Sequence, residues 1–378
     1  MILLSPGGDN ARQSAESDNT LAIATTDGVF ILRREDDGDW RVLNHALAGC
    51  FVSALTAIGD DLFAATHGIG MARSRDGGQS WQWINNGITQ YDFWSARAGQ
   101  LDGRDVIFAG TMPAHLFVSF DRGDSWAECA GLRSVPSAAQ WCFPPPPRLG
   151  HVKDIVIADN RLFVGIEIGA LLVSDDGGKT FTDLQVDPDP AESDVHRILI
   201  HPKKPDRILV SNGLVGMMRS EDRGATWLKD PMPPEMNYPD AFVVHPDDPD
   251  LLFVSAAVGW PPHWYKLRRA RGKIARSHDG GQTWTRLLGG LPDGQRALFG
   301  AMTIAATGHD FAIYAADTDG QVFESTDGGD RWQMIAELAP VSKGDFYRAM
   351  AKGRPPIANL DDMAFNRNAT QRIATTKV

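Results

Sequence analysis

Ser174-Asp-Asp-Gly-Gly-Lys-Thr-Phe181 is one of six copies of a short pattern that decides the fold of this 378-residue chain. Most copies read Ser-x-Asp-x-Gly-x-(Ser/Thr)-(Trp/Phe), and successive central aspartates lie 45, 55, 46, 57 and 48 residues apart. A period of this length, with several short strands per unit, is typical of the blades of a β-propeller. The other five copies are Ser74–Trp81, Ser119–Trp126, Ser220–Trp227, Ser277–Trp284 and Ser325–Trp332.

Each copy follows a short apolar run and precedes another, which predicts a β-hairpin. In 174–181 the carboxylate of Asp176 can accept backbone N–H groups of its own turn, and the glycines allow backbone angles that a side chain would forbid. The terminal aromatic residue is large enough to fill the gap between blades. Calcium sites built on these aspartates are the alternative. Because Ca²⁺ takes six to eight oxygen ligands and each turn offers few free ones, hairpins that use these oxygens for their own hydrogen bonds are favoured.

The pattern resembles the Asp-box, or BNR repeat, of sialidases, sortilin-type receptors, xyloglucan-degrading enzymes and photosystem assembly factors. Six copies at blade spacing cover nearly the whole chain, so the resemblance implies a β-propeller. It does not imply one activity, because families that share these turns differ in their sites.

A degenerate seventh copy, Arg33–Trp40, lies upstream, and residues 21–32 before it match the middle of a blade. No clear innermost strand precedes them. The segment Leu360–Arg367 resembles innermost strands elsewhere, such as Val195–His201. We therefore expect an all-β, seven-bladed propeller, a single domain over residues 1–378, whose ring is closed by the tail 359–378 pairing with the first blade.

Composition excludes several classes of function. The net charge of −11 disfavours general nucleic-acid binding, and no apolar stretch is long enough to span a membrane. No secretory signal is visible, so a cytoplasmic location is expected. The three cysteines have neither metal-ligand spacing nor an even count for disulfides. Phosphate-binding glycine loops, dinucleotide fingerprints and serine nucleophile elbows are absent, so no nucleotide cofactor is expected.

Two insertions exceed the repeat and are expected on the upper face, where they would border a binding site. Residues 131–150 carry Trp141 and four consecutive prolines, and residues 259–273 carry three aromatic residues followed by a basic run. The insertions could contact a protein partner. The basic run could guide an anionic ligand, although a solvated loop is the simpler interpretation.

In a propeller, the starts of innermost strands and the loops between second and third strands meet on the upper face. Different polar residues occupy these equivalent positions, which indicates a shaped pocket for a small-molecule ligand. We expect a divalent metal (Zn, Fe, Mn or Ca) on His151, Glu167 and His196; the alternative is a hydrogen-bonded ring without metal. The expected catalytic residues are Glu167, His196, His67, Asn212 and Asp240, and the expected substrate-binding residues are Trp94, His115, Arg197, Tyr238, Trp260, His263 and Asp317.

Sialidase activity is disfavoured. Sialidases resemble this chain in their turns, but they need an arginine in a Phe/Tyr-Arg-Ile-Pro motif and a tyrosine paired with glutamate, and neither is found here. Xyloglucan-type enzymes pair two seven-bladed domains, of which only one is present. Two hypotheses remain: a hydrolase or lyase acting on a small polar or aromatic metabolite, and a non-enzymatic module that binds or assembles a protein partner. The clustered histidines and Glu167 favour the enzyme.

Overall fold

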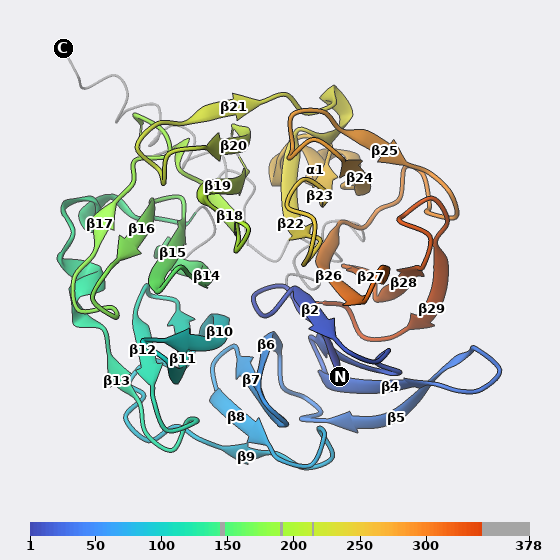
Figure 1. The fold of residues 1–378 in the computed structure, drawn as a ribbon, viewed down its shortest axis with the longest axis horizontal. Coiled ribbons are helices and arrows are strands. Elements are labelled where there is room, and N and C mark those ends of the chain that lie inside the picture. Colours follow the sequence, from blue (N-terminus) through green and yellow to red (C-terminus); the bar gives the residue numbers. More distant parts are fainter. Residues whose placement is uncertain (144–147, 190–191, 214, 342–378) are drawn as a thin grey trace.

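The computed structural model describes residues 1–143, 148–189, 192–213 and 215–341. Over these residues the chain forms seven sheets arranged as a ring around a central axis (Figure 1). Six sheets have four strands, and the seventh has a fifth strand added at its inner side. The expected seven-bladed propeller is confirmed. No helix in the described part of the chain is long and apolar enough to cross a membrane.

The blades repeat one order of strands from the axis outwards. The innermost strands are β1 (Ile2–Leu4), β6 (Val52–Ile58), β10 (Phe93–Leu101), β14 (His151–Ala158), β18 (Val195–His201), β22 (Tyr238–Val244) and β26 (Phe299–Thr307). The second strands are β3 (Thr20–Thr25), β7 (Asp61–Thr66), β11 (Arg104–Thr111), β15 (Arg161–Glu167), β19 (Lys204–Asn212), β23 (Leu252–Ala257) and β27 (Asp310–Asp317).

The outer half of each blade contains the recurring hairpin. The third strands are β4 (Gly28–Arg34), β8 (Gly70–Ser74), β12 (Leu116–Ser119), β16 (Ala170–Ser174), β20 (Gly216–Ser220), β24 (Lys273–Ser277) and β28 (Gln321–Ser325). The outermost strands are β5 (Trp40–Ala46), β9 (Gln82–Trp83), β13 (Ala127–Glu128), β17 (Thr182–Asp183), β21 (Leu228–Asp230), β25 (Thr285–Leu287) and β29 (Gln333–Glu337). Every Asp-box therefore joins a third strand to a fourth, as expected.

The polar groups of each hairpin form hydrogen bonds with one another. Ser174 Oγ donates to Asp176 Oδ1 at 2.8 Å and accepts from Gly178 N at 2.8 Å, while Thr180 N donates to Asp176 Oδ1 at 2.9 Å. The hydrogen bonds from Thr180, the largest effect, lower the pKa of Asp176 to about 2. Because the carboxylate oxygens are used within the turn, the structure favours a structural role for the hairpin over a calcium site.

The core lies between the blades rather than within any one of them. Val152 and Val164 of blade 4 pack with Phe108 and Leu116 of blade 3, and all four are fully buried. The Asp-box aromatic residues join these contacts: Trp126 is buried, and its indole N–H donates to Ile84 O of the preceding blade at 2.7 Å. Second and third strands such as β15 and β16 are covered on both faces by neighbouring blades, which explains their nearly unbroken hydrophobic runs.

The first blade is completed by the N-terminal segment. Strand β1 runs parallel to β3, with Ile2 opposite Leu21, and occupies the position that we expected the tail 359–378 to fill. Strand β2 (Ala11–Ser14) then runs parallel to β26 of blade 7, with Ala11 opposite Ile304. Residues 359–378 lie outside the described residues, and closure by the tail is not confirmed. The N-terminal segment joins the first and last blades through its two parallel pairings.

Between β1 and β2 the chain passes through the middle of the ring (Figure 1). Gly7 N donates to Ser53 O and Gly7 O accepts from Ala96 N, both at 3.0 Å. Arg197 donates to the carbonyl oxygens of Pro6 and Gly8 at 2.9 and 3.0 Å. A Cβ at Gly7 would lie 2.1 Å from a backbone oxygen, so only glycine fits there. Residues 5–10 therefore occupy the central channel and were missed as such in the sequence.

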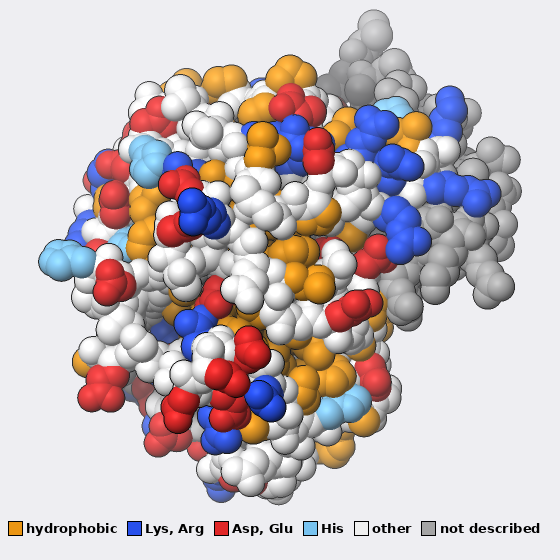
Figure 2. All heavy atoms as spheres, turned by 90° about the vertical axis from the view of Figure 1, so that its right-hand side faces the viewer, with side chains coloured by type: hydrophobic (Ala, Val, Ile, Leu, Met, Phe, Trp, Pro, Cys, Tyr) orange, Lys and Arg blue, Asp and Glu red, His pale blue; other side chains and the backbone are white. Residues whose placement is uncertain are grey.

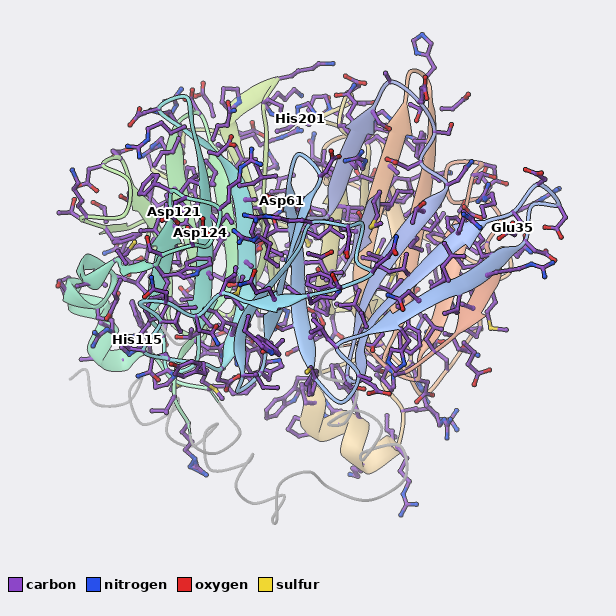
Figure 3. The ribbon with its side chains drawn as sticks, turned by 90° about the horizontal axis from the view of Figure 1, so that it is seen from below. Glu35, Asp61, His115, Asp121, Asp124 and His201 are labelled. Carbon is purple, nitrogen blue, oxygen red and sulfur yellow. The ribbon has the colours of Figure 1, made fainter. Side chains whose placement is uncertain are left out.

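The insertions lie on one face of the ring. Residues 259–273 contain α1 (Pro261–Leu267), and the short 3₁₀ helices η1 (Ala130–Ser134) and η2 (Pro136–Gln140) lie at the start of the other insertion. The edge view shows α1 and His115 on the same face, and His201 at the opposite one (Figure 3). This agrees with the expected upper face and with the expected lower-face position of the His201 turn.

Candidate functional site

The upper end of the channel holds a cluster of buried charged side chains. His151 begins β14, Glu167 ends the neighbouring strand β15, and these two residues are paired in the ladder. His151 Nε2 lies 2.9 Å and Lys153 Nζ 2.6 Å from Glu167 Oε2. All three side chains are less than a tenth exposed. One oxygen of Glu167 thus faces two nitrogen groups of its own blade.

The other oxygen of Glu167 faces the next blade. His196 Nε2 lies 3.8 Å from Glu167 Oε1 and 3.4 Å from Asp194 Oδ1. One ligand atom from each of these three residues lies within 4.8 Å of the other two, and all three residues are buried. Two of the three expected metal ligands, Glu167 and His196, therefore belong to one group that could hold a cation. The third expected ligand, His151, instead contacts the far oxygen of Glu167.

Asp194 was missed in the sequence. It directly precedes β18 and lies in the long connection between blades 4 and 5, where the repeat gives no register for alignment. Its position could have identified it, because Asp194 immediately precedes an innermost strand and the starts of these strands lie on the upper face. An acidic residue at that place can reach His196 on the same strand.

The orientation of His196 is fixed by a backbone carbonyl. Its Nδ1 lies 2.7 Å from Pro239 O, so Nδ1–H donates and Nε2 faces the carboxylates, where it can carry a proton or bind a cation. Tyr238 OH lies 3.4 Å from Nε2, and Asp240 Oδ1 lies 3.8 Å from Nδ1. Burial, the largest effect, lowers the pKa of His196, but Asp194, Asp240 and Glu167 together outweigh it and raise the net pKa.

Aromatic side chains form a wall beside His151. The Trp94 ring lies 3.9 Å from the His151 ring, and Phe143 lies 4.8 Å from His151 and 5.6 Å from Trp94. The Lys153 ammonium lies 5.8 Å from the Trp94 ring centroid. His67 meets the other edge of Trp94 at 4.8 Å, and its Nδ1 lies 2.6 Å from Asp92 Oδ1. Phe143, from the 131–150 insertion, was not expected among the site residues.

The second insertion supports the cluster from behind. Trp264 of α1 is fully buried, its indole N–H donates to Val258 O at 3.0 Å, and its ring meets Tyr238 edge-on at 5.1 Å. Tyr238 in turn lies 5.0 Å from the His196 ring. Trp260 packs against this group, whereas His263 is exposed on α1. The insertion therefore positions Tyr238, while His263 lies at the outside.

Three other expected residues use their polar atoms outside the group of Glu167, Asp194 and His196, although Asn212 lies next to it because it pairs with Val195 across the strands. His115 Nδ1 lies 2.8 Å from Glu128 Oε1, close to the outer strand of blade 3. The Asn212 amide donates to Glu192 O at 2.7 Å and accepts from Val215 N at 3.0 Å, so it shapes the turn after β19. Asp317 Oδ1 accepts from Asp319 N and Gln321 N, both at 2.9 Å. In the structure these three side chains hold their own turns or strands.

Arg197 lies below the cluster, among the residues that surround the N-terminal segment. Arg197 lies 3.0 Å from Asp154. Arg97 lies 3.6 Å from the same Asp154 and 3.2 Å from Asp9. Burial lowers the pKa of Arg197, the largest of several opposing effects. This chain of alternating charges crosses the channel. Arg197 therefore holds residues 5–10, which we call the strap, in place and does not face the upper opening.

Comparisons with known proteins agree with the fold. A family model described as "Sortilin, neurotensin receptor 3" (Sortilin-Vps10) matches residues 169–288. No curated protein sequence matches the chain. Among solved structures, the GH74 xyloglucanase from Xanthomonas campestris superposes with a TM-score of 0.61 and 17% identity, covering 88% of this chain and 55% of that one. YCF48 from Cyanidioschyzon merolae gives a TM-score of 0.54 and 14% identity, covering 86% and 94%.

These similarities show the fold alone, because the identities are low. The chain spans only part of the GH74 structures it matches, between 38% and 55% of their length. A structure of YCF48 bound to D1 peptide gives a TM-score of 0.50 and 13% identity, covering 80% of this chain and 96% of that one. The structural neighbours thus include both glycoside hydrolases and a protein that binds a peptide.

Proposed function

We propose that this chain, a seven-bladed Asp-box propeller, is a metal-dependent hydrolase or lyase that acts on a small polar or aromatic metabolite at its upper mouth. The observation that carries the proposal is the convergence of Glu167, Asp194 and His196 within 4.8 Å of one another. A docking surface for a protein does not need two buried carboxylates that face the Nε2 atom of an imidazole.

Charge balance supports a cation at this place. Burying two carboxylates is costly unless positive charge accompanies them. Lys153, at 2.6 Å from Glu167, supplies one such charge on the far oxygen. A divalent cation between Glu167 Oε1, Asp194 and His196 Nε2 would neutralise the rest. This set of three ligands with one nitrogen suits Mn²⁺, Fe²⁺ or Zn²⁺ better than Ca²⁺, which takes six to eight oxygens.

The cation would leave coordination positions for water or substrate. A bound water has a lowered pKa and can attack or accept a proton near neutral pH. Tyr238 OH, at 3.4 Å from His196 Nε2, is placed to hydrogen-bond a group bound there. Trp94 and Phe143 offer aromatic surface on the His151 side, which suits a ring or the apolar face of a sugar.

Metal content tests this proposal. We expect protein purified without a metal-binding tag and loaded with Mn²⁺, Fe²⁺ or Zn²⁺ to retain stoichiometric metal after dialysis. Glu167→Gln and Asp194→Asn should lose it. Glu128→Gln is the matched control, because it removes a carboxylate 2.8 Å from His115 on the same face but outside the cluster. No retained metal in the parent protein, or equal retention in all variants, would refute the proposal.

A second candidate function is a binding module for an acidic protein segment. Among the described residues, the side chains of Lys266, Arg268, Arg269 and Arg271 in the 259–273 insertion make neither an ion pair nor a hydrogen bond, although the net charge is −11. Figure 2 shows Lys and Arg side chains gathered on one part of the ring's side. The described residues of the 131–150 insertion lie on the same face as α1. Charge reversal at Lys266 and Arg268 that abolishes a partner without affecting metal content would favour this candidate.

A further inference from the structure

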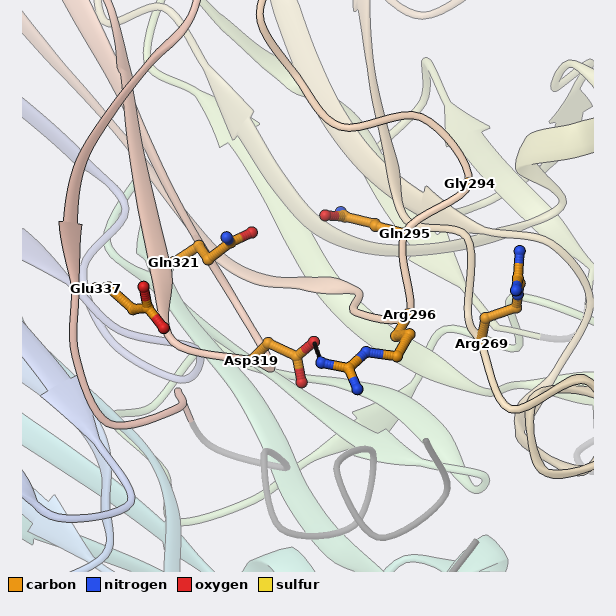
Figure 4. Close-up of a pocket in the computed structure, with 7 residues that line it drawn as sticks. All are labelled: Arg269, Gly294, Gln295, Arg296, Asp319, Gln321 and Glu337. Atoms are coloured by element: carbon orange, nitrogen blue, oxygen red, sulfur yellow. Dashed lines mark hydrogen bonds and ion pairs between the residues drawn. The ribbon is translucent and has the colours of Figure 1, made fainter. Parts of the chain in front are cut away.

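A pocket lies on the outer part of the ring, between blades 6 and 7. It has a volume of about 520 Å³, and Figure 4 shows the side chains around it. Arg269 comes from the residues after α1, Gln295 and Arg296 from the connection between β25 and β26, Asp319 from the turn between β27 and β28, and Glu337 from the end of β29. None of these belongs to the cluster around Glu167.

The charges of this pocket are separated. Arg296 Nη2 lies 3.2 Å from Asp319 Oδ2, so these two side chains largely neutralise each other. Arg269 makes no ion pair or side-chain hydrogen bond with the described residues, and neither does Glu337. In Figure 4 Arg269 and Glu337 lie at opposite ends of the pocket, with the Arg296–Asp319 pair between them. A ligand would meet a cationic end and an acidic end.

Gln295 adds a hydrogen-bond requirement. Its Nε2 donates to Gly272 O at 3.4 Å, which assigns the other amide atom as the oxygen. That oxygen, Gln295 Oε1, is buried and accepts no hydrogen bond from the described residues. Buried acceptors in proteins are nearly always paired, so an unpaired one that borders a pocket indicates a donor supplied by a ligand or by water.

We propose that this pocket binds a small carboxylate that carries hydroxyl or ammonium donors at its other end. The carboxylate would pair with Arg269, whose planar guanidinium matches two carboxylate oxygens. The donors would serve the carboxylate of Glu337, and the side chain of Gln295 would turn to present its buried oxygen to them. Hydroxy acids, including sugar acids, and free amino acids share this chemistry. The inference does not depend on the metal cluster or on the reaction proposed for it.

Calorimetric titration of the whole protein tests the proposal. The probes are sodium D-glucuronate for hydroxyl donors and L-glutamine for an ammonium donor, with D-glucose and inorganic phosphate as controls for hydroxyls alone and charge alone. We expect one of the two carboxylates to bind, and the better one identifies the source of the donors. No binding of either carboxylate at millimolar concentration, or equal binding of phosphate, would overturn the proposal.

Two variants locate the bound probe. Arg269→Gln should raise the dissociation constant at least about tenfold, the effect of losing one good charged contact. Gln295→Leu should also weaken binding, because it removes the buried acceptor. Arg268→Gln is the matched control, since Arg268 is the exposed neighbour that does not line the pocket. An unchanged dissociation constant in Arg269→Gln would contradict the assignment, whatever the metal content of the protein.

Discussion

His196 Nδ1 lies 2.7 Å from the carbonyl oxygen of Pro239, and this one contact decides what the ring can do. Because a carbonyl only accepts, Nδ1 carries a proton, and Nε2 is the nitrogen that can bind a metal or exchange a proton. Asp240, at 3.8 Å from Nδ1, reinforces this arrangement electrostatically. The imidazole is thus oriented before any ligand arrives, as in metal sites where an outer partner fixes the tautomer.

Asp240 should therefore affect metal affinity without being a ligand. We expect Asp240→Asn to weaken Mn²⁺ or Zn²⁺ binding by about tenfold, the lower end of the range for outer partners of metal-bound histidine. His196→Asn should weaken binding further. Competition with a fluorescent chelator measures both. If Asp240→Asn lost metal as completely as His196→Asn, Asp240 would be a direct ligand and this account of the site would be wrong.

Lys153 should balance the charge of Glu167. Replacing Lys153 by Met leaves a buried carboxylate without its nearest cation, so we expect the metal-free protein to lose about 3 kcal/mol of unfolding free energy. Added metal should restore more stability in this variant than in the parent, because it would then supply the missing charge. Urea unfolding with and without Mn²⁺ measures the difference. Lys229→Met, at an exposed outer strand, is the control and should change little.

The sequence predicts the scaffold well because each hairpin is a local structure. Asp176 and its neighbours form hydrogen bonds with one another within eight residues, and the same chemistry recurs in six of the seven blades. The register then places His151, Glu167 and His196 at equivalent upper positions, and the structure brings them together. The features that the sequence did not predict depend on residues far apart in the chain. Asp194 lies in a connection of irregular length, and the strap at residues 5–10 is held by contacts with distant blades.

The direction of the side chains is the second feature that the sequence did not predict. Asn212 and Asp317 have the expected positions, but their polar atoms bind backbone groups: Asp317 those of its own turn, and Asn212 those of its own turn and of Glu192. A single sequence does not show whether a polar residue at a loop faces a pocket or caps a turn. The repeat gives the Cα position, while the hydrogen-bond partners of each loop decide where the side chain points.

Asp317 should make the protein less stable as pH rises from about 4 to about 7. Burial, the largest effect, raises its pKa from 3.8 to about 7, and Oδ2 is buried without a hydrogen bond among the described residues. A raised folded pKa means that its stabilisation is complete below the unfolded pKa and is lost as pH rises through about 7. We expect Asp317→Asn to reduce the loss of unfolding free energy between about pH 5 and pH 8 by roughly 2 kcal/mol. Identical pH profiles for parent and variant would contradict this.

The strap through the channel should depend on Gly7. An alanine Cβ would lie 2.1 Å from Trp94 O, a backbone atom that cannot move without displacing β10. We expect Gly7→Ala to destabilise the protein by about 3 kcal/mol, comparable with severe overpacking of a core. Gly49→Ala is the control: Gly49 has a positive φ of 80° but open space around it, so only backbone strain of about 1 kcal/mol is expected there. Thermal unfolding of both variants separates crowding from strain, and a Gly7 variant no less stable than the Gly49 variant would show that the strap is not packed as the structure has it.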